Sequence, residues 1–540
     1  MQTLKHLFNN KTILIIGGVL LLASLFPSGV SAEGIHQSLC MCRLAAVDSV
    51  CSQEAASHSI CIDKTFIDNV VNQAGVNFDL RDGTGADLGK VRVRDNEFTI
   101  SGTQKVYLSN ADGAKINNEN LNISITAEGH PQSFVAFLKT NIGEGPSEVG
   151  AKSLNVTATN AVNAANRWLG AEESVILQTA ERAGEEGEQE RIFFGNIYVP
   201  TDPFNADSVT MQTAGVIKQY GGGDIYVQAP EGSTGPGGSI SLRGKTIYAG
   251  TINAAGNPDS GQVSIEAENA SFGDIVLHSI EGWVAPAQFS DNLTVPANQL
   301  LSINGLGGNN VGSFKAETVY LQAADSITDL NITAEDRISF QAVSAYSGCI
   351  PGTTQEIEDY PDKPKRKICQ VGNSGNINLE VTGEWGDGGR GILIKNKIDN
   401  DAIASEGASP GSDPESVSGG EGFAGDVILK ATNALVSPGR ERGIFSRGFH
   451  LQEIAGVETF SIHLRGRFIY FGFGEWGRLG IRSSSVESEV FPEEITRWPL
   501  GVAREEVGGA NVKIEPVIAP LDSTLAEGCV PGEKGGCLAF

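Results

Sequence analysis

The stretch from Gly221 to Ile280 decides the fold and reads GGGDIYVQAPEGSTGPGGSISLRGKTIYAGTINAAGNPDSGQVSIEAENASFGDIVLHSI. One short phrase recurs in it: a glycine, then a polar residue, then alternating apolar positions. Because successive side chains of a strand point to opposite faces, Ile240 and Leu242 share one face while Ser239 and Ser241 share the other. Each copy of the phrase therefore predicts a short strand with one buried face.

The copies of this phrase begin at Gly223, Gly238, Gly261, Gly273, Gly375 and Gly425, with a looser copy at Gly312. Those at Gly238 and Gly261 are about 23 residues apart, a spacing typical of one coil in a stacked repeat. A unit of this size is too small to bury its own apolar face, so it packs that face against its neighbours. The predicted fold class is therefore all-β, with a parallel β-solenoid as the body of the chain.

The composition suits a β-rich chain that is exported and does not bind nucleic acid. The 540 residues include 67 glycines and carry a formal net charge of −26. Nucleic-acid binding requires clustered lysine and arginine at the phosphates, which so acidic a chain does not favour.

The first 32 residues read as a signal peptide. Lys5 and Lys11 lie in a short cationic start before an apolar run, Thr12–Phe26, and small residues follow at Val30–Ala32, where a signal peptidase cuts. The alternative is an uncleaved anchor, but the run of about 15 residues is shorter than the roughly 20 that a membrane-spanning helix needs. We expect cleavage, a mature chain that begins at Glu33 and no transmembrane segment after cleavage.

The cysteines agree with export, because an even number in an exported chain indicates disulfides. We expect Cys349 to pair with Cys369 and Cys529 with Cys537, since each pair closes a local loop. The four cysteines of the N-terminal group allow three pairings, among which the sequence does not choose. A metal site built on the Cys-x-Cys thiolates is the alternative. The eight cysteines are Cys40, Cys42, Cys51, Cys61, Cys349, Cys369, Cys529 and Cys537.

The chain divides into segments by pattern. Residues 33–75 place apolar residues at helical spacing and predict a small disulfide-linked helical cap, which covers the open end of the stack or has a recognition role. Residues 76–486 form the predicted β-solenoid. Residues 487–540 are rich in proline and have no repeat, and we interpret them as a C-terminal cap or extension.

Two insertions interrupt the solenoid. The first, near 350–369, carries four basic residues and predicts a loop with a basic tip, either a docking point or a solvated loop. The second, at 404–424, is rich in serine, glycine, proline and acidic residues, a composition that predicts disorder because it cannot bury a core.

Two tryptophans lie in a repeated Gly-Glu-Trp-Gly segment, at Trp385 and Trp476. They are candidate glycan contacts, because an exposed indole ring offers a flat face to a sugar. The alternative is that they fill corners of the solenoid through their large buried area.

The Gly-[Asp/Asn/Ser/Gln]-[Ile/Val]-x-[Val/Leu/Ile] phrase resembles that of filamentous haemagglutinin-type adhesins and, more broadly, of pectin-lyase-like right-handed parallel β-helix proteins. The resemblance covers residues 205–485 and extends loosely to 76–204. It implies a right-handed parallel β-helix, and for the haemagglutinin-type proteins it implies a secreted surface fibre that mediates adhesion.

Catalytic chemistry has one candidate, a column of carboxylates. Asp224, Asp274 and Asp426 follow the turn glycine in their copies of the phrase, which predicts that they stack in neighbouring coils. Paired carboxylates suit glycoside hydrolysis or Ca²⁺ binding. A polar residue at this point is also what a solvent-facing strand start requires. We expect no catalytic residue and no cofactor, with Ca²⁺ as the ion such a column would take.

These observations favour a non-enzymatic, exported β-solenoid that is adhesin-like or structural, secreted or held at the surface of a Gram-negative bacterium or in its extracellular matrix. Its expected partner is a surface glycan, a component of a host or neighbouring cell, or another copy of itself. The alternatives are a polysaccharide-active β-helix lyase or hydrolase, and a periplasmic protein without a surface role.

Overall fold

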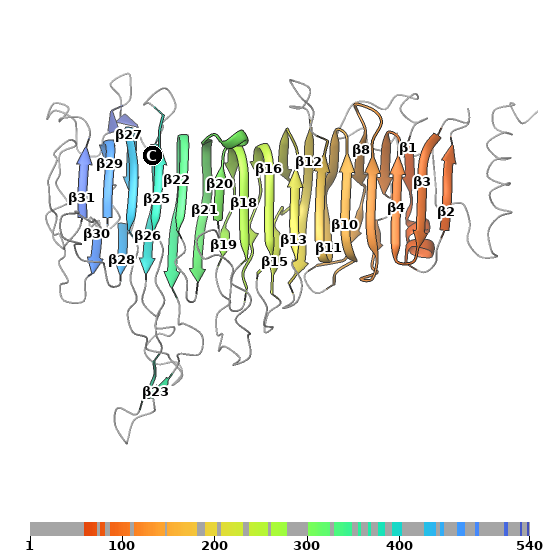
Figure 1. Cartoon of the computed structure of the whole chain (residues 1–540), viewed down its shortest axis with the longest axis horizontal. Helices are drawn as coiled ribbons and strands as arrows, with labels where there is room; N and C mark the ends of the chain where they lie inside the picture. Colours follow the sequence, from red (N-terminus) through yellow and green to blue (C-terminus); the bar gives the residue numbers. More distant parts are fainter. Residues whose placement is uncertain are drawn as a thin grey trace, which may run out of the picture. The chain divides into compact units, whose positions relative to one another are not determined.

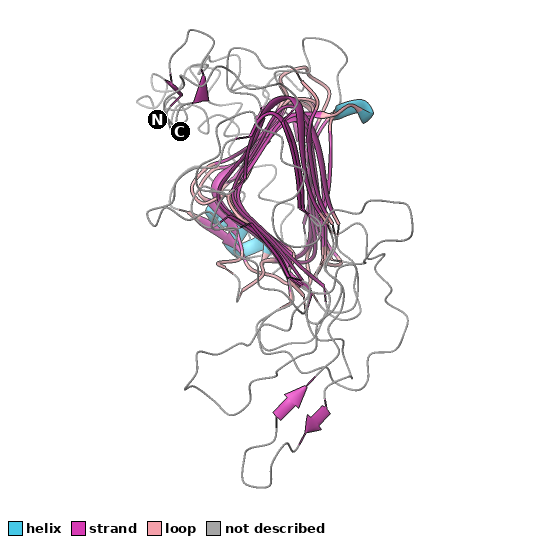
Figure 2. Cartoon of the chain, turned by 90° about the vertical axis from the view of Figure 1, so that its left-hand side faces the viewer, coloured by secondary structure: helices cyan, strands magenta, loops and turns pink. Residues whose placement is uncertain are grey.

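The structure is a computed structural model, and strands account for most of its described residues (Figure 2). The chain is therefore an all-β protein, as predicted. The described residues are 59–72, 76–81, 87–108, 113–145, 148–180, 190–201, 207–229, 237–256, 261–277, 301–323, 329–347, 355–357, 366–368, 376–383, 391–401, 426–438, 443–447, 462–469, 481–484, 512–516, 530–531 and 537–538.

The chain forms two compact units. Unit 1 comprises Met1–Pro200 with Asp207–Tyr226, and unit 2 comprises Thr201–Ala206 with Val227–Phe540. Figure 1 labels their strands. The elements of unit 1 are β1 (Ser59–Ile62), α3 (Lys64–Phe66), η2 (Ile67–Val71), β2 (Val76–Arg81), β3 (Asp87–Arg94), β4 (Glu97–Gly102), β5 (Lys105–Leu108), β6 (Ala114–Ile116), β7 (Asn122–Ala127), β8 (Phe134–Phe137), β9 (Thr140–Ile142), β10 (Ala151–Ala158), β11 (Ala161–Thr179), β12 (Arg191–Pro200), β13 (Ser208–Gln212) and β14 (Val216–Gln219).

Strand β15 (Ile225–Gln228) contains the boundary between the units. The elements of unit 2 are β16 (Ser239–Tyr248), β17 (Ile252–Asn253), β18 (Gln262–Ser271), β19 (Ile275–Leu277), β20 (Leu301–Asn304), η5 (Leu306–Gly308), β21 (Val311–Ala323), β22 (Leu330–Ser347), β23 (Gln355–Ile357), β24 (Arg366–Ile368), β25 (Ile377–Val381), β26 (Gly391–Asp401), β27 (Val427–Pro438), β28 (Gly443–Arg447), β29 (Ile462–Ile469), β30 (Ile481–Ser484), β31 (Val512–Pro516), β32 (Val530–Pro531) and β33 (Cys537–Leu538).

Parallel pairing in unit 1 stacks buried apolar residues in three columns, each joined strand to strand by register. Within every column the partners are aliphatic or aromatic and almost fully buried. The first column is Phe98–Ile123–Leu154–Val175–Val209, the second is Val106–Val135–Val162–Ile192–Ile217, and the third is Ile116–Ile142–Leu169–Ile197. Each column buries its members against the strands before and after, which a single short strand cannot do alone.

The beginning of unit 1 departs from the predicted pattern in two ways. Strands β2, β3 and β4 pair antiparallel, so the parallel ladder starts where β4 pairs with β7. The helical spacing predicted for 33–75 is correct only for α3 and η2 within the described part of that segment. Residues Ser59–Ile62 form β1, parallel to β5, because their buried side chains extend the second column through Ile60 and Val106.

The short helical segment that follows β1 is held by a polar cap and an apolar face. The Asp63 carboxylate accepts a hydrogen bond from the backbone N–H of Phe66 at 3.0 Å. Phe66, Val70 and Val71 are buried, as their spacing predicts. The rest of the predicted cap, which includes Cys40, Cys42 and Cys51, lies outside the described residues.

Unit 2 repeats the same plan with its own three columns. The first column is Ile240–Val263–Leu301, which resumes as Leu330–Ile377–Val427–Ile462–Val512. The second is Ile247–Ala270–Phe314–Ile338–Ile392–Val436–Ile469. The third is Ile252–Ile275–Val319–Val343–Ile398–Ile444–Ile481.

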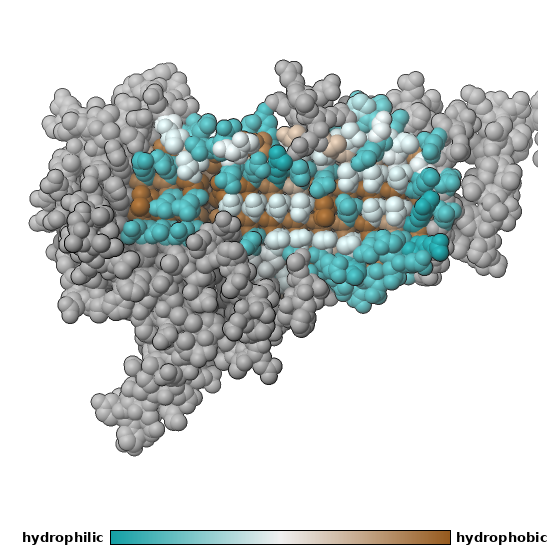
Figure 3. Space-filling model, viewed as in Figure 1, coloured by the Kyte–Doolittle hydropathy of each residue, from teal (hydrophilic) through white to brown (hydrophobic). Residues whose placement is uncertain are grey.

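The predicted alternation is confirmed in β16, where Ile240 and Leu242 are buried while Ser239 and Ser241 are exposed. Figure 3 shows the consequence on one face of the molecule, where pale and teal side chains lie over a brown apolar layer. The turn glycine of the phrase is required by close backbone approach. A Cβ atom on Gly261 would lie 1.8 Å from the carbonyl oxygen of Gly238.

The two predicted insertions fall between strands that keep their register. Ile377 pairs with Leu330 before the first insertion and with Val427 after the second, so neither insertion shifts the first column. Strands β23 and β24 form an antiparallel hairpin within the first insertion. The predicted disorder at 404–424 lies outside the described residues.

Candidate functional site

Several residues singled out by the sequence have no described position. The candidate glycan contacts Trp385 and Trp476 lie outside the described residues, and their role stays a prediction. Cys61 is buried in β1 beside Tyr107, and Cys537 belongs to β33. The disulfide pairings also stay predictions, because the remaining cysteines lie outside the described residues: Cys40, Cys42, Cys51, Cys349, Cys369 and Cys529.

The prediction that Asp426 stacks in one column with Asp224 and Asp274 is wrong. In unit 2, Asp274 precedes Ile275 of the third column, whereas Asp426 precedes Val427 of the first column. The reason is that the phrase marks strand starts in both columns, which the sequence does not distinguish.

The backbone N–H of Asp426 lies instead at the end of a ladder in which side chains cap backbone groups. The carboxylate of Asp329 accepts a hydrogen bond from the N–H of Asn376 at 2.6 Å. The side-chain oxygen of Asn376 in turn accepts from the N–H of Asp426 at 2.8 Å. Burial raises the pKa of the Asp426 carboxyl. Asp329 and Asn376 satisfy backbone donors at the start of successive strands, a structural task.

The outward face of the second column in unit 1 carries two pairs of aromatic rings, each with a lysine beside one ring. We call the first pair, together with its lysine, the covered pair. It consists of Tyr107, Phe134 and Lys105. The two rings meet edge to face with centroids 5.1 Å apart, and the Lys105 ammonium lies 5.5 Å from the centre of the Phe134 ring. Tyr107 is 2% exposed and packs with Cys61 and Ala136. The rings of this pair therefore contribute to the packing of the core.

The second pair, which we call the open pair, consists of Phe193, Tyr220 and Lys218. Its geometry repeats the first: the rings meet edge to face with centroids 5.3 Å apart, and the Lys218 ammonium lies 5.2 Å from the centre of the Tyr220 ring. Phe193 and Lys218 are register partners on β12 and β14. Tyr220, however, is 41% exposed, so its ring is accessible.

Two backbone hydrogen bonds fix the main chain at Tyr220. The Tyr220 N–H donates to the carbonyl of Phe194 at 2.8 Å, and its carbonyl accepts from the N–H of Asn166 at 3.0 Å. The chain then turns through Gly221, Gly222 and Gly223, all at positive φ. Because glycine reaches these angles without strain, the chain turns sharply directly after Tyr220.

Polar and aromatic groups follow this turn. The Tyr226 hydroxyl donates to the Asp224 carboxylate at 3.2 Å. Burial raises the pKa of Tyr226, and the adjacent Asp224 charge and hydrogen bond act in the same direction. Trp168 precedes Leu169 of the third column, and its buried Nε1 has no hydrogen-bond partner in the structure.

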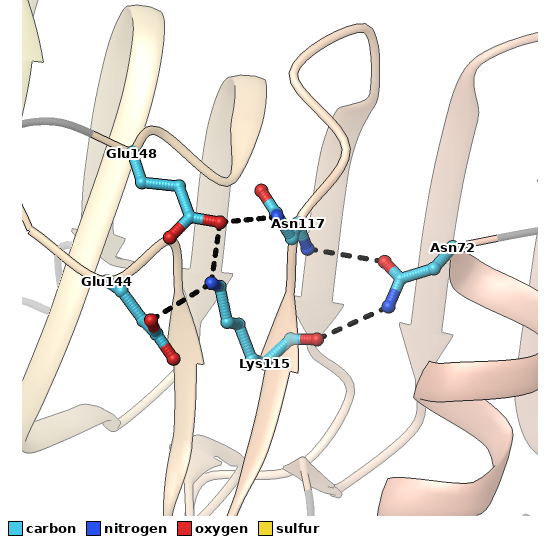
Figure 4. A network of polar contacts seen from close by, with 5 residues as sticks. All are labelled: Asn72, Lys115, Asn117, Glu144 and Glu148. Carbon is cyan, nitrogen blue, oxygen red and sulfur yellow. Dashed lines mark hydrogen bonds and ion pairs between the residues drawn. The ribbon is translucent and has the colours of Figure 1, made fainter.

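A separate polar network in unit 1 joins the helical segment to the ladder (Figure 4). The Lys115 ammonium contacts the carboxylates of Glu148 at 2.6 Å and Glu144 at 3.2 Å. Asn72 donates to the Lys115 carbonyl at 3.3 Å and accepts from the Asn117 N–H at 3.2 Å. Burial lowers the pKa of Lys115, but hydrogen bonds to the two glutamates outweigh it, and the net pKa is raised. Its charge is fully paired, so the network is structural.

The open pair has the chemistry of a sugar-binding surface. An aromatic ring offers an apolar face to the C–H groups of a pyranose, and the lysine beside it adds a positive charge. The sequence contained one signal for it. In the segment Ile192–Phe194, alternation turns Ile192 and Phe194 inward and forces Phe193 outward.

Among the residues whose side chains are described, no group of three or more His, Cys, Asp or Glu residues is placed to hold a metal ion. The same part of the chain contains no helix long and apolar enough to cross a membrane. Comparison with protein-family models, with curated proteins and with solved structures finds no match for this chain.

Proposed function

We propose that this chain is an exported β-solenoid of the cell surface or extracellular matrix that binds glycans without cleaving them, as an adhesin or matrix component does. The open pair of Phe193, Tyr220 and Lys218 is its glycan-contacting surface. The main support for this proposal is that Tyr220 is 41% exposed while its backbone is fixed on both sides by hydrogen bonds.

The parallel β-solenoid is supported by the registers inside each unit, and its right hand is what the resemblance to β-helix proteins implies. Three buried columns recur in both, and strands adjacent in a column pair in parallel. A coil with three strands per turn produces this pattern, because every turn of the coil then adds one residue to each column. Such a scaffold presents outward side chains in rows about 4.8 Å apart, a rigid platform for an extended ligand.

Export is supported by the sequence. Residues 1–32 have the order of charged, apolar and small residues that a signal peptidase recognises. An even number of cysteines fits an oxidising compartment. A surface or extracellular location would bring the open pair into contact with polysaccharides.

Fractionation of producing cells, followed by a glycan array with the exported protein, tests this proposal. The Tyr220→Ala variant should lose glycan retention. Tyr248→Ala is the matched control, because Tyr248 is an equally exposed tyrosine, at 44%, and has no aromatic partner among the described rings.

The proposal is supported if the array retains the wild-type protein and the Tyr248→Ala variant but not the Tyr220→Ala variant. Release of shortened sugars from the array would identify a polysaccharide-active enzyme instead, and a periplasmic fraction without glycan retention would contradict a surface role.

A further inference from the structure

Unit 2 contains a pocket of about 360 Å³ on the outward side of three consecutive strands, β21, β22 and β26. Its polar lining is formed by Lys315, Glu317, Ser339, Gln341 and Lys395. A pocket of this volume lies in the range of sites for small molecules, and one sugar residue fits in it.

Register explains how these side chains meet. Lys315 on β21 is the partner of Ser339 on β22, and Glu317 and Gln341 lie two residues further along the same strands. The small Ser339 side chain therefore leaves a depression beside Lys315.

A β-bulge in β26 places the second lysine. Phe340 pairs with Ile394, but Ala342 pairs with Lys397, so β26 has one more residue than β22 across this step. Lys395 lies within the bulge. A bulge re-aims the side chains of its strand, and bulges recur beside binding sites.

The polar side chains of the pocket have no hydrogen-bond or ion-pair partner in the described part of the chain. Ser339 is 6% exposed, and its hydroxyl makes no hydrogen bond to another described residue. Among the described residues, Lys315, Glu317, Gln341 and Lys395 also make no side-chain hydrogen bond or ion pair. Because these side chains have no such contact to give up, a ligand can hydrogen-bond to them in place of water.

We infer that this pocket binds one monocarboxylated sugar residue, such as a uronic acid unit of a polysaccharide. Two lysines and one glutamate give the lining a net charge of about +1, which matches a single carboxylate better than a phosphate dianion. Ser339, Gln341 and Glu317 suit the hydroxyl groups of the same sugar. The inference deepens the proposed glycan binding and rests on it for the source of the ligand.

Isothermal titration of the full chain tests the inference with the methyl glycosides of glucuronic and galacturonic acid. Methyl glucoside and methyl galactoside are the matched uncharged ligands, and inorganic phosphate is the second anion. We expect saturable binding of a uronoside, weaker binding of phosphate and none of the neutral glycosides.

Lys315→Ala and Lys395→Ala should each lower the uronoside affinity about tenfold, because each removes one charge-assisted contact. Both lysines are exposed, so circular dichroism should be unchanged. Lys430→Ala is the matched control, since Lys430 lies in the same unit but its ammonium already pairs with Glu380 at 2.7 Å. It should leave the affinity unchanged.

Three outcomes would overturn the inference: no uronoside binding, equal binding of neutral and charged glycosides, or phosphate binding tighter than uronoside binding. Failure here is distinguishable from failure of the proposed function, because Tyr220→Ala leaves this pocket intact and Lys315→Ala leaves the open pair intact. Glycan retention that depends on Tyr220 but not on Lys315 would reject the pocket alone.

Discussion

The covered pair and the open pair of unit 1 have the same composition and nearly the same geometry, but they differ in exposure. Ring centroids are 5.1 Å apart in one and 5.3 Å in the other, and each pair has a lysine beside one ring. Tyr107 is 2% exposed and Tyr220 is 41% exposed. Burial, rather than residue type, therefore decides whether an aromatic pair stabilises the fold or remains available to a ligand.

The largest expected effect is on stability and belongs to the covered pair. Tyr107→Ala should lower the free energy of unfolding by about 3 kcal/mol, because it leaves a cavity among Cys61, Ala136 and Phe134. Urea denaturation followed by circular dichroism measures this loss. Tyr220→Ala should lower the free energy of unfolding by less than about 1 kcal/mol, since its ring is already in water. Equal losses of unfolding free energy for the two variants would contradict the difference in burial between the two pairs.

The next effect is on binding and belongs to the open pair. Tyr220→Ala should weaken the affinity for the retained glycan about tenfold, because an aromatic platform contributes roughly 1 kcal/mol or more. Tyr220→Phe should keep most of the affinity, since the ring remains and only the hydroxyl is lost. Isothermal titration measures both, and similar losses for the two variants would show that the ring face is not the contact.

A smaller effect is expected from the lysine. Lys218→Met should weaken glycan binding about threefold, because a cation near an exposed ring contributes about 0.5–1 kcal/mol. Lys105→Met should leave binding unchanged, since Lys105 lies beside the covered pair. An equal reduction by both variants would point to general electrostatic attraction.

The smallest effect comes from a buried acid in unit 2. Burial raises the pKa of Asp426 in the folded protein, so its contribution to stability is fully present below the unfolded pKa of about 4 and is lost as the pH rises through the folded pKa. Asp426→Asn should therefore be more stable than wild type at pH 7 and no more stable at pH 3. Melting temperature against pH measures this, and a difference that is constant with pH would contradict it.

The sequence predicted the strands well, because their signal is local. In the copies at Gly238 and Gly261, alternation identified the buried residues Ile240 and Val263. It did not show which column a copy belongs to, since Gly273 and Gly425 start strands of different columns with the same residues, Gly-Asp. Column membership depends on the residues between copies, and their length varies.

The candidate site was less predictable than the fold. Outward placement of Phe193 follows from alternation, but its contact with Tyr220 depends on the register of β12 with β14 across the turn before Val216. The first strand of the ladder was also not predicted from the sequence. Ser59–Ile62 follows a helix-like pattern and yet forms β1, because a parallel strand there completes the hydrogen bonds of β5.

One measurement compares the two pairs in a single sample: ¹⁹F NMR of the protein labelled with 3-fluorotyrosine, titrated with the retained glycan. The chain has nine tyrosines, and Tyr107→Phe and Tyr220→Phe assign the two resonances. We expect a saturable shift of the Tyr220 resonance and none of the Tyr107 resonance. A Tyr220 resonance that stays unmoved while the glycan binds would contradict this expectation.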